Sequence, residues 1–196
     1  MKLKRILSLA LSGVMAISML TACGGGSGIF GSRGQSATFA QLLNKEQKML
    51  DFGSNDGSLN RAVSAVVRSV SEDEKNVNGP DTGDIAAAVR VQTGYSDMWL
   101  NGAWSVVEES SHSVKVFIYD ATTYTLNEVA SKVAEAIDEI AIDEKAAKDD
   151  GTYTNTYEGD VAAYSVTIPA AESGADDTEL WVVAIAIEQT ATKSST

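Results

Sequence analysis

Residues 180–187 read Leu-Trp-Val-Val-Ala-Ile-Ala-Ile, an uninterrupted run of eight apolar residues near the C-terminal end of the sequence. A run without alternation of apolar and polar residues is typical of a strand that is buried on both faces, and such a strand lies inside a sheet. Residues 114–119 and 161–168 are also rich in β-branched and aromatic residues and predict two further strands. Together the three runs predict a sheet with 180–187 in its middle.

Two amphipathic segments in the first half of the sequence predict helices. The first covers residues 38–52 and opens with Thr38 and Gln41, which form a capping-box pattern. The second covers residues 59–70, in which apolar residues recur at helical spacing after the turn-forming sequence Asn-Asp-Gly-Ser at 55–58. Both helices therefore have an apolar face that can pack on the sheet.

A third helix is expected to start at the capping box formed by Thr125 and Glu128 and to continue to about residue 148. Glu144 and Lys148 are spaced as a favourable helical ion pair, which supports this length. Residues 84–92 are either a short helix or an Ala-rich strand, and we favour the helix. The order of these elements predicts an α+β fold in which helices pack on a mixed or antiparallel sheet as an α/β/α sandwich.

Three side chains between the second and third helices are candidates for a ligand groove. Asn101-Gly102 is a strong hairpin signal, and Trp99 and Trp104 flank it as a cross-strand pair. We expect the two indoles to cover the core, with a ligand-facing aromatic patch as the alternative. His112 has no partner nearby in sequence that would make it a base or a metal ligand, so we interpret it as an exposed loop residue.

The N-terminal segment predicts export. Lys2, Lys4 and Arg5 precede an uncharged stretch at residues 6–20, whose helical length of about 22 Å is shorter than a hydrocarbon core of about 30 Å. This pattern is typical of a signal peptide rather than a transmembrane helix. The residues that end it, Leu20-Thr21-Ala22-Cys23, resemble the bacterial lipobox, in which the cysteine thiol accepts a diacylglyceryl group.

The lipobox resemblance implies a lipoprotein anchored through Cys23, with palmitate-type chains holding it to the cell membrane on the extracytoplasmic face. The alternative is a plain secretory signal with an incidental cysteine. The Gly24 that follows and the Gly-rich tether look like those of lipoproteins from single-membrane bacteria. The expected organisation is a signal peptide at 1–22, a lipidated Cys and Gly/Ser tether at 23–36, one α+β domain at 37–190 and a disordered tail at 191–196.

The composition excludes several classes of function. With 27 acidic and 15 basic residues the formal net charge is −12, which opposes binding to nucleic acid and to anionic surfaces. One Cys and one His exclude an internal disulfide and leave no usual zinc ligand set. The acidic segment 120–179 is expected to be a solvated surface, with calcium binding as the alternative. No phosphate-binding loop, dinucleotide fingerprint or serine nucleophile elbow is present, so no cofactor is expected.

Five short motifs resemble the CAP family of cysteine-rich secretory, antigen-5 and pathogenesis-related proteins. They are Leu-Leu-Asn-Lys-Glu-Gln at 42–47, Pro-Asp-Thr-Gly at 80–83, Gly-Tyr-Ser at 94–96, and the last two strand sequences at 157–164 and 180–183. The resemblance covers about residues 36–190 and implies an α/β/α sandwich.

The sequence departs from the CAP pattern where that family holds a metal. The family's histidines would fall at residues 76–78 and within 141–150, and neither stretch contains a histidine. The family's Glu-Asn-Ile motif also has no clear counterpart near 116–119. The resemblance therefore implies a degenerate CAP-like domain that has lost its metal cleft and carries over no catalytic residue.

These observations favour a non-enzymatic binding or scaffolding module that meets an extracellular protein or a small apolar ligand. The alternative is an envelope hydrolase that uses a carboxylate or metal site. A cleft lined by paired carboxylates would favour the hydrolase, and a shallow groove lined by Trp99 or Trp104 would favour binding.

Overall fold

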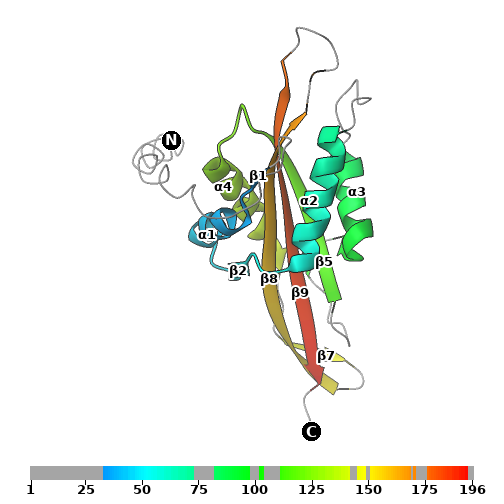
Figure 1. Cartoon of the computed structure of the whole chain (residues 1–196). Coiled ribbons are helices and arrows are strands. Elements are labelled where there is room, and N and C mark those ends of the chain that lie inside the picture. The colour runs from blue at the N-terminus through cyan, green and yellow to red at the C-terminus, as the bar shows by residue number, and fades with distance from the viewer. Residues whose placement is uncertain are drawn as a thin grey trace, which may run out of the picture.

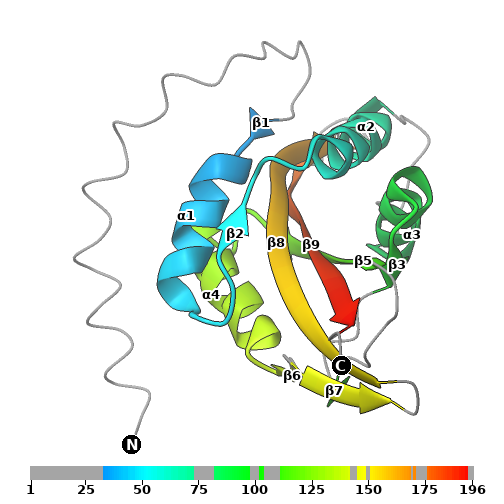
Figure 2. The ribbon, with the colours of Figure 1, turned by 90° about the horizontal axis from the view of Figure 1, so that it is seen from below.

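The computed structural model describes residues 33–72, 82–97, 102–103, 111–141, 145–148, 151–168, 170 and 176–193. In this part of the chain a long sheet stands between two pairs of helices (Figure 1). Helices α1 (Ser36–Glu46) and α4 (Leu126–Ile137) cover one face, and α2 (Gly57–Glu72) and α3 (Thr82–Thr93) cover the other. The view from below in Figure 2 shows these three layers directly. The expected α+β fold with helices packed on a mixed sheet is confirmed.

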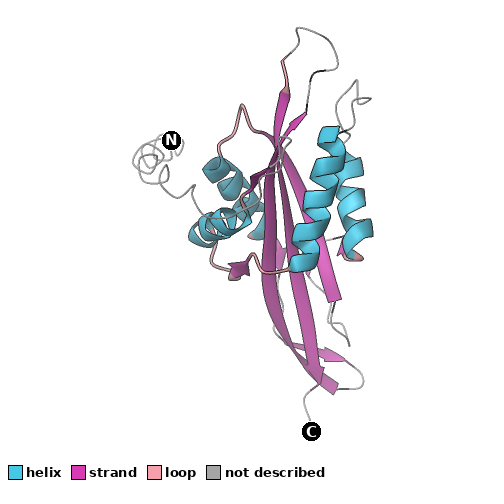
Figure 3. Ribbon diagram, viewed as in Figure 1, coloured by secondary structure: helices cyan, strands magenta, loops and turns pink. Residues whose placement is uncertain are grey.

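Three long strands form the centre of the sheet. They are β5 (Ser111–Asp120), β8 (Gly151–Ile168) and β9 (Thr178–Lys193), and β9 pairs antiparallel with both of the others. β8 and β9 run beyond the helices as a ribbon, which Figure 3 shows as the long magenta strands below the cyan helices. The domain extends beyond the expected bounds 37–190. Strand β1 and the first residue of α1 lie in the stretch 23–36 that was expected to be a tether, and β9 continues to Lys193, into the stretch 191–196 that was expected to be a disordered tail.

Short strands extend the sheet at its edges. The strand order is β1-β8-β9-β5-β3, and β2 and β7 also pair with β8. β2 and β3 run parallel to their neighbours, which makes the sheet mixed. Outside it, β4 and β6 pair with each other. The bounds of the short strands are Arg33–Gly34 (β1), Phe52–Gly53 (β2), Ser96–Asp97 (β3), Gly102–Ala103 (β4), Ile140–Ala141 (β6) and Lys145–Lys148 (β7).

The apolar run in β9 is buried on both faces, as its sequence predicts. Val183, Ile185 and Ile187 pack in the core under α1 and α4. Val182, Ala184 and Ala186 pack in the core under α2 and α3, and all six side chains are at most 4% exposed. The small alanines on the second face leave room for α2 and α3 to lie close to the sheet. The predicted central position of this strand is therefore confirmed.

The first helix starts two residues before the predicted residue 38 and ends six residues before the predicted residue 52. α1 runs from Ser36 to Glu46, so Thr38 lies inside its first turn and the expected capping box is wrong. The helix ends just before Gln47, whose buried side chain forms hydrogen bonds with the backbone of the residues that follow. Its Oε1 accepts hydrogen bonds from the N–H groups of Met49 (2.7 Å) and Leu50 (3.1 Å), and its Nε2 donates to the Leu50 carbonyl (2.6 Å). These bonds turn the chain away from the helix axis.

The helix expected from Thr125 to residue 148 is correct at its start and wrong at its end. α4 ends at Ile137, and residues 140–141 and 145–148 are strands. β7 pairs antiparallel with the start of β8, with Lys148 opposite Gly151. The backbone hydrogen bonds of this hairpin outweigh the local helical pattern that Glu144 and Lys148 suggested. Glu144 itself lies outside the described residues.

Replacing Thr125 with alanine is expected to lower the free energy of unfolding by about 1 kcal/mol. The Thr125 side chain accepts from the Glu128 N–H, and Glu128 Oε2 accepts from the Thr125 N–H at 2.8 Å, so the mutation opens a complete capping box. The matched control is Thr123→Ala, because Thr123 is exposed and lies in the turn before the helix. Urea unfolding of both variants is the measurement, and equal midpoints for the two would contradict the prediction.

Two further predictions are confirmed, and two lie outside the described part of the chain. Residues 84–92 are helical, within α3, and Gly94 closes that helix with a φ of 74° while its N–H donates to the Arg90 carbonyl (2.8 Å). α2 contains the predicted helix 59–70. Asn101, Trp99 and Trp104 fall outside the described residues, so the pairing of the two indoles stays a prediction. Gly102 of the predicted hairpin turn is described, and it belongs to β4, which pairs with β6. Among the described helices, none combines the length and the apolar character that crossing a bilayer requires.

Candidate functional site

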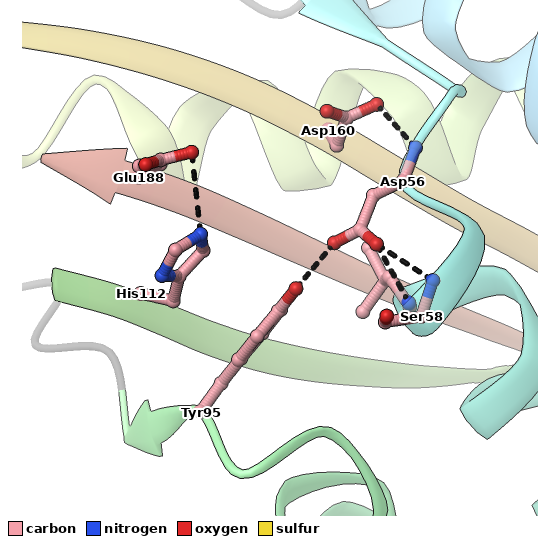
Figure 4. Close-up of polar contacts among 7 residues, drawn as sticks. Asp56, Ser58, Tyr95, His112, Asp160 and Glu188 are labelled. Atoms are coloured by element: carbon pink, nitrogen blue, oxygen red, sulfur yellow. Dashed lines mark hydrogen bonds and ion pairs between the residues drawn. The ribbon is translucent and has the colours of Figure 1, made fainter. Parts of the chain in front are cut away.

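A hollow of about 320 Å³ lies on the α2/α3 side of the sheet, where α2 begins and α3 has just ended. We call it the acidic hollow. Its floor is formed by β5, β8 and β9. Its rim is formed by the segment before α2 and the segment after α3 (Figure 4). The lining residues are Asn55, Asp56, Tyr95, His112, Glu158, Asp160, Ala186 and Glu188.

Asp56 sits at the rim because it caps helix α2. Its Oδ1 accepts hydrogen bonds from the N–H groups of Ser58 (2.8 Å) and Leu59 (3.0 Å), which are free at the start of a helix. Its Oδ2 accepts a hydrogen bond of 2.7 Å from the Tyr95 hydroxyl. Both carboxylate oxygens of Asp56 therefore hold parts of the fold together.

His112 lies on β5 between two partners. Its Nε2 is 3.2 Å from Glu188 Oε2, and Glu188 is the residue directly opposite it on β9. The other side of the imidazole stacks on the Tyr95 ring, with 4.9 Å between centroids and 21° between planes. The His112 side chain is 40% exposed. The expectation of a loop histidine is therefore wrong: the residue is on a strand and has defined partners.

Asp160 and Glu158 add two more carboxylates from β8. Asp160 Oδ1 accepts hydrogen bonds from the N–H groups of Asn55 (2.8 Å) and Asp56 (3.2 Å), so it fixes the turn that leads into α2. Glu158 is exposed and lies directly opposite Glu188 in the pairing of β8 with β9. The two glutamates place like charges side by side, which makes the electrostatic potential of the hollow more negative.

Tyr95 is held in its neutral form by this environment. Burial raises the pKa of its phenol well above the ordinary value, and the hydrogen bond to Asp56 raises it further. The negative charges of Asp56, Glu188 and Asp160 act in the same direction. The hydroxyl therefore stays protonated and keeps donating to Asp56 throughout the physiological pH range.

The acidic hollow brings together four carboxylates, one imidazole and one phenol. Such a surface attracts cations and positively charged groups and repels anions. Within the residues that the structure describes, no group of three or more His, Cys, Asp or Glu side chains is arranged to hold a metal ion. Part of the acidic segment 120–179 falls outside those residues, so the expected solvated surface stays a prediction, with calcium binding as its alternative.

A second hollow, of about 350 Å³, lies along the outer edge of β5. Its lining residues are Gly83, Val116, Phe117, Ile118 and Tyr119. β3 pairs with this edge only opposite Ser113 and Val114, so the four β5 residues of the lining lie beyond that short strand. This hollow is more apolar than the acidic hollow and lies apart from it on the same strand.

Of the predicted site residues, the structure describes only His112. Cys23, Trp99 and Trp104 lie outside the described residues, so the candidate groove of two indoles and His112 stays a prediction. Sequence reasoning missed Asp56, Tyr95, Asp160 and Glu188 as members of one site. The sequence Asn-Asp-Gly-Ser at 55–58 predicts a turn before the second helix, but nothing in the spacing of the four residues links them.

Comparisons with known proteins give no relatives for this chain. No protein-family model, no curated protein and no solved structure matches it.

Proposed function

We propose that this chain is a membrane-anchored extracytoplasmic lipoprotein whose α+β domain is a non-enzymatic binding module, with the acidic hollow as its contact surface. The observation that carries the binding role is the state of the carboxylates. Asp56, Asp160 and Glu188 each already hold a hydrogen bond or close contact with another part of the fold. The hollow is thus a fixed, negatively charged surface rather than a set of free acids.

This arrangement favours binding over hydrolysis. A carboxylate that works as general acid or base must exchange a proton with its substrate. Protonation of Asp56 would weaken the cap of α2 and its bond from Tyr95, and protonation of Asp160 would weaken the turn at Asn55. Proton transfer to Asp56 or Asp160 during catalysis would therefore disturb the shape of the hollow.

The charge of the hollow also narrows the class of partner. Its lining includes four carboxylates and no Lys or Arg. A partner that presents a lysine, an arginine or another cationic group fits this surface better than a small apolar ligand does. The flat stack of Tyr95 on His112 offers an adjoining surface for the apolar stem of such a side chain.

One observation favours the alternative, an envelope hydrolase. Glu188 orients the imidazole of His112, as an acid partner orients a catalytic histidine, in a hollow that also contains Asp160. The two functions differ in what they do to a bound cationic peptide, because only the hydrolase would cleave it.

The test uses a pentalysine peptide as the probe and the full chain in a mild detergent. We expect the peptide to bind, to stay intact, and to bind about threefold more weakly to Glu158→Lys than to wild type. The matched control is Glu135→Lys, because Glu135 is an exposed residue of α4 on the opposite face. Equal weakening by both variants would contradict the assignment of the site, and cleavage of the peptide that both His112→Gln and Glu188→Gln abolish would support the hydrolase.

Two finer parts of the proposal concern ancestry and location. The arrangement of helices on both faces of the sheet supports the proposal that the domain is a degenerate CAP-like domain. The comparisons with known proteins give no further support for it. The basic, apolar and lipobox segments at the N-terminus support attachment through Cys23 on the outside of a single-membrane bacterium.

A further inference from the structure

A continuous series of side-chain contacts links the sheet to the start of α2. Glu188 on β9 contacts His112 on β5, His112 stacks on Tyr95 after α3, and Tyr95 donates a hydrogen bond to Asp56. Asp56 in turn accepts from the first N–H groups of α2. His112, Tyr95 and Asp56 therefore connect β9 and β5 with the start of α2, as Figure 4 shows.

In the part of the chain that the structure describes, the charged groups that line the hollow around this imidazole are of one sign. Glu188 faces it from β9, Glu158 and Asp160 line the same hollow from β8, and Asp56 does so from the segment before α2. No Lys or Arg is among the lining residues.

Described cations on the neighbouring elements have other partners or face elsewhere. Arg61 of α2 donates from Nη2 to Ser58 Oγ at 3.5 Å. Arg90 of α3 is paired with Asp97 of β3 at 2.9 Å. Lys115, on the same strand as His112, is three residues away and so projects from the other face of the sheet.

We propose that His112 is a pH-responsive clasp that holds the α2/α3 layer more firmly on the sheet when its imidazole is protonated. A protonated ring forms a full ion pair with Glu188 and a cation–π contact with the Tyr95 ring, whereas a neutral ring keeps only a hydrogen bond and stacking. Both added interactions exist only when the ring carries a proton, so the clasp tightens as the pH falls.

His112 is the only histidine in the 196-residue sequence, which makes the clasp separable from other pH effects. The overall negative charge also changes as the pH falls, but that change is shared by wild type and by a variant without the imidazole. The difference between the two chains therefore reports on His112 alone. The inference does not depend on the proposed binding function, because its readout is the stability of the fold.

The experiment is urea unfolding of the full chain in detergent at pH 5.5 and pH 8.0, for wild type and His112→Gln. We expect the ratio of the two unfolding constants to change about fivefold between the two pH values, with wild type relatively more stable at pH 5.5. Glu188→Gln should show less than half of the wild-type response, whereas Tyr95→Phe should keep most of it because the ring remains. A ratio that is the same at both pH values within about twofold would overturn the proposal.

A second measurement on wild type keeps the test decisive if the glutamine variant does not fold. The amides of Ser58 and Leu59, which donate to Asp56, should gain about threefold in hydrogen-exchange protection at pH 5.5 relative to pH 8.0, after correction for intrinsic exchange rates. The Glu128 amide at the start of α4 is the internal control, because the clasp does not reach that helix. Equal changes at both helix starts would overturn the proposal.

Discussion

The variant Gly159→Ala is expected to unfold with a free energy about 2 kcal/mol lower than wild type. Gly159 of β8 is the register partner of Phe52 of β2, and the phenyl ring occupies the space where a Cβ of residue 159 would lie. A Cβ at position 159 would be 2.6 Å from both Cδ1 and Cε1 of Phe52, which is closer than carbon atoms pack. Either the ring or strand β8 must therefore shift.

Phe52 cannot move aside at low cost. Its side chain is 4% exposed and belongs to the core under α1 and α4. Its backbone is held from both sides by Asn44, whose Oδ1 accepts from the Phe52 N–H and whose Nδ2 donates to the Phe52 carbonyl, each at 2.9 Å. The strain of the added methyl group is therefore expected to appear as lost stability rather than as a small local adjustment.

Gly57→Ala is the matched control for this prediction. Gly57 is the first residue of α2, and the nearest atom to a Cβ there is Arg61 Nη1 at 4.0 Å. We expect a change within about 0.5 kcal/mol, in the stabilising direction, because alanine is the better helix residue. In addition, Phe52→Leu should recover part of the loss when combined with Gly159→Ala. Equal stability of the two glycine variants would contradict the packing of Phe52 on Gly159.

The second large effect concerns Cys23. Replacing it with serine is expected to abolish incorporation of labelled palmitate and to leave the chain as an uncleaved precursor that is 22 residues longer. The reason is chemical: a thiolate is the nucleophile that accepts the diacylglyceryl group, and a serine hydroxyl does not ionise near neutral pH. Gel fluorography of cells that express each variant is the measurement.

Two controls separate attachment at Cys23 from general effects on export. Ser27→Ala changes the tether four residues further on and should leave both labelling and processing at the wild-type level. The double variant Cys23→Ser with Ser27→Cys should stay unlabelled, because its thiol no longer follows Leu20-Thr21-Ala22. Full labelling of Cys23→Ser would show that the lipid is attached elsewhere.

Sequence reasoning succeeded where the determinants of structure are local or purely compositional. The capping box of Thr125 and Glu128 consists of residues three apart, and both of its hydrogen bonds are present. The central place of β9 follows from eight consecutive apolar side chains, which only a doubly covered strand can bury. Gly94 likewise ends its helix because it adopts a positive φ at little cost.

It failed where distant residues compete with a local pattern. Residues 145–148 have an Ala-rich helical sequence, yet they pair with the start of β8 because that strand is long enough to offer them a hydrogen-bonding edge. The apolar pattern predicts a first helix that reaches Phe52, yet the side chain of Gln47 forms hydrogen bonds with the backbone at Met49 and Leu50 and the helix ends before them. Neither interaction follows from the spacing of apolar residues.

The acidic hollow could not be predicted because its residues come from five separate stretches of the chain. Asp56 and Tyr95 are 39 positions apart, and Asn55 and Asp160 are 105 apart, yet hydrogen bonds join each pair. Only the register of β5 with β9 places Glu188 against His112. The residue types were visible in the sequence, whereas their proximity depends on the topology of the sheet.

The most direct test of the account is mass spectrometry of the N-terminal tryptic peptide, taken from protein recovered from the membrane fraction of cells that express the full chain. We expect a peptide of residues 23–33, ending at Arg33, with two fatty acyl chains on a glyceryl thioether at Cys23 and a further acyl group where the amine is also modified. A peptide that begins at another residue, or one that carries an unmodified thiol at Cys23, would contradict it.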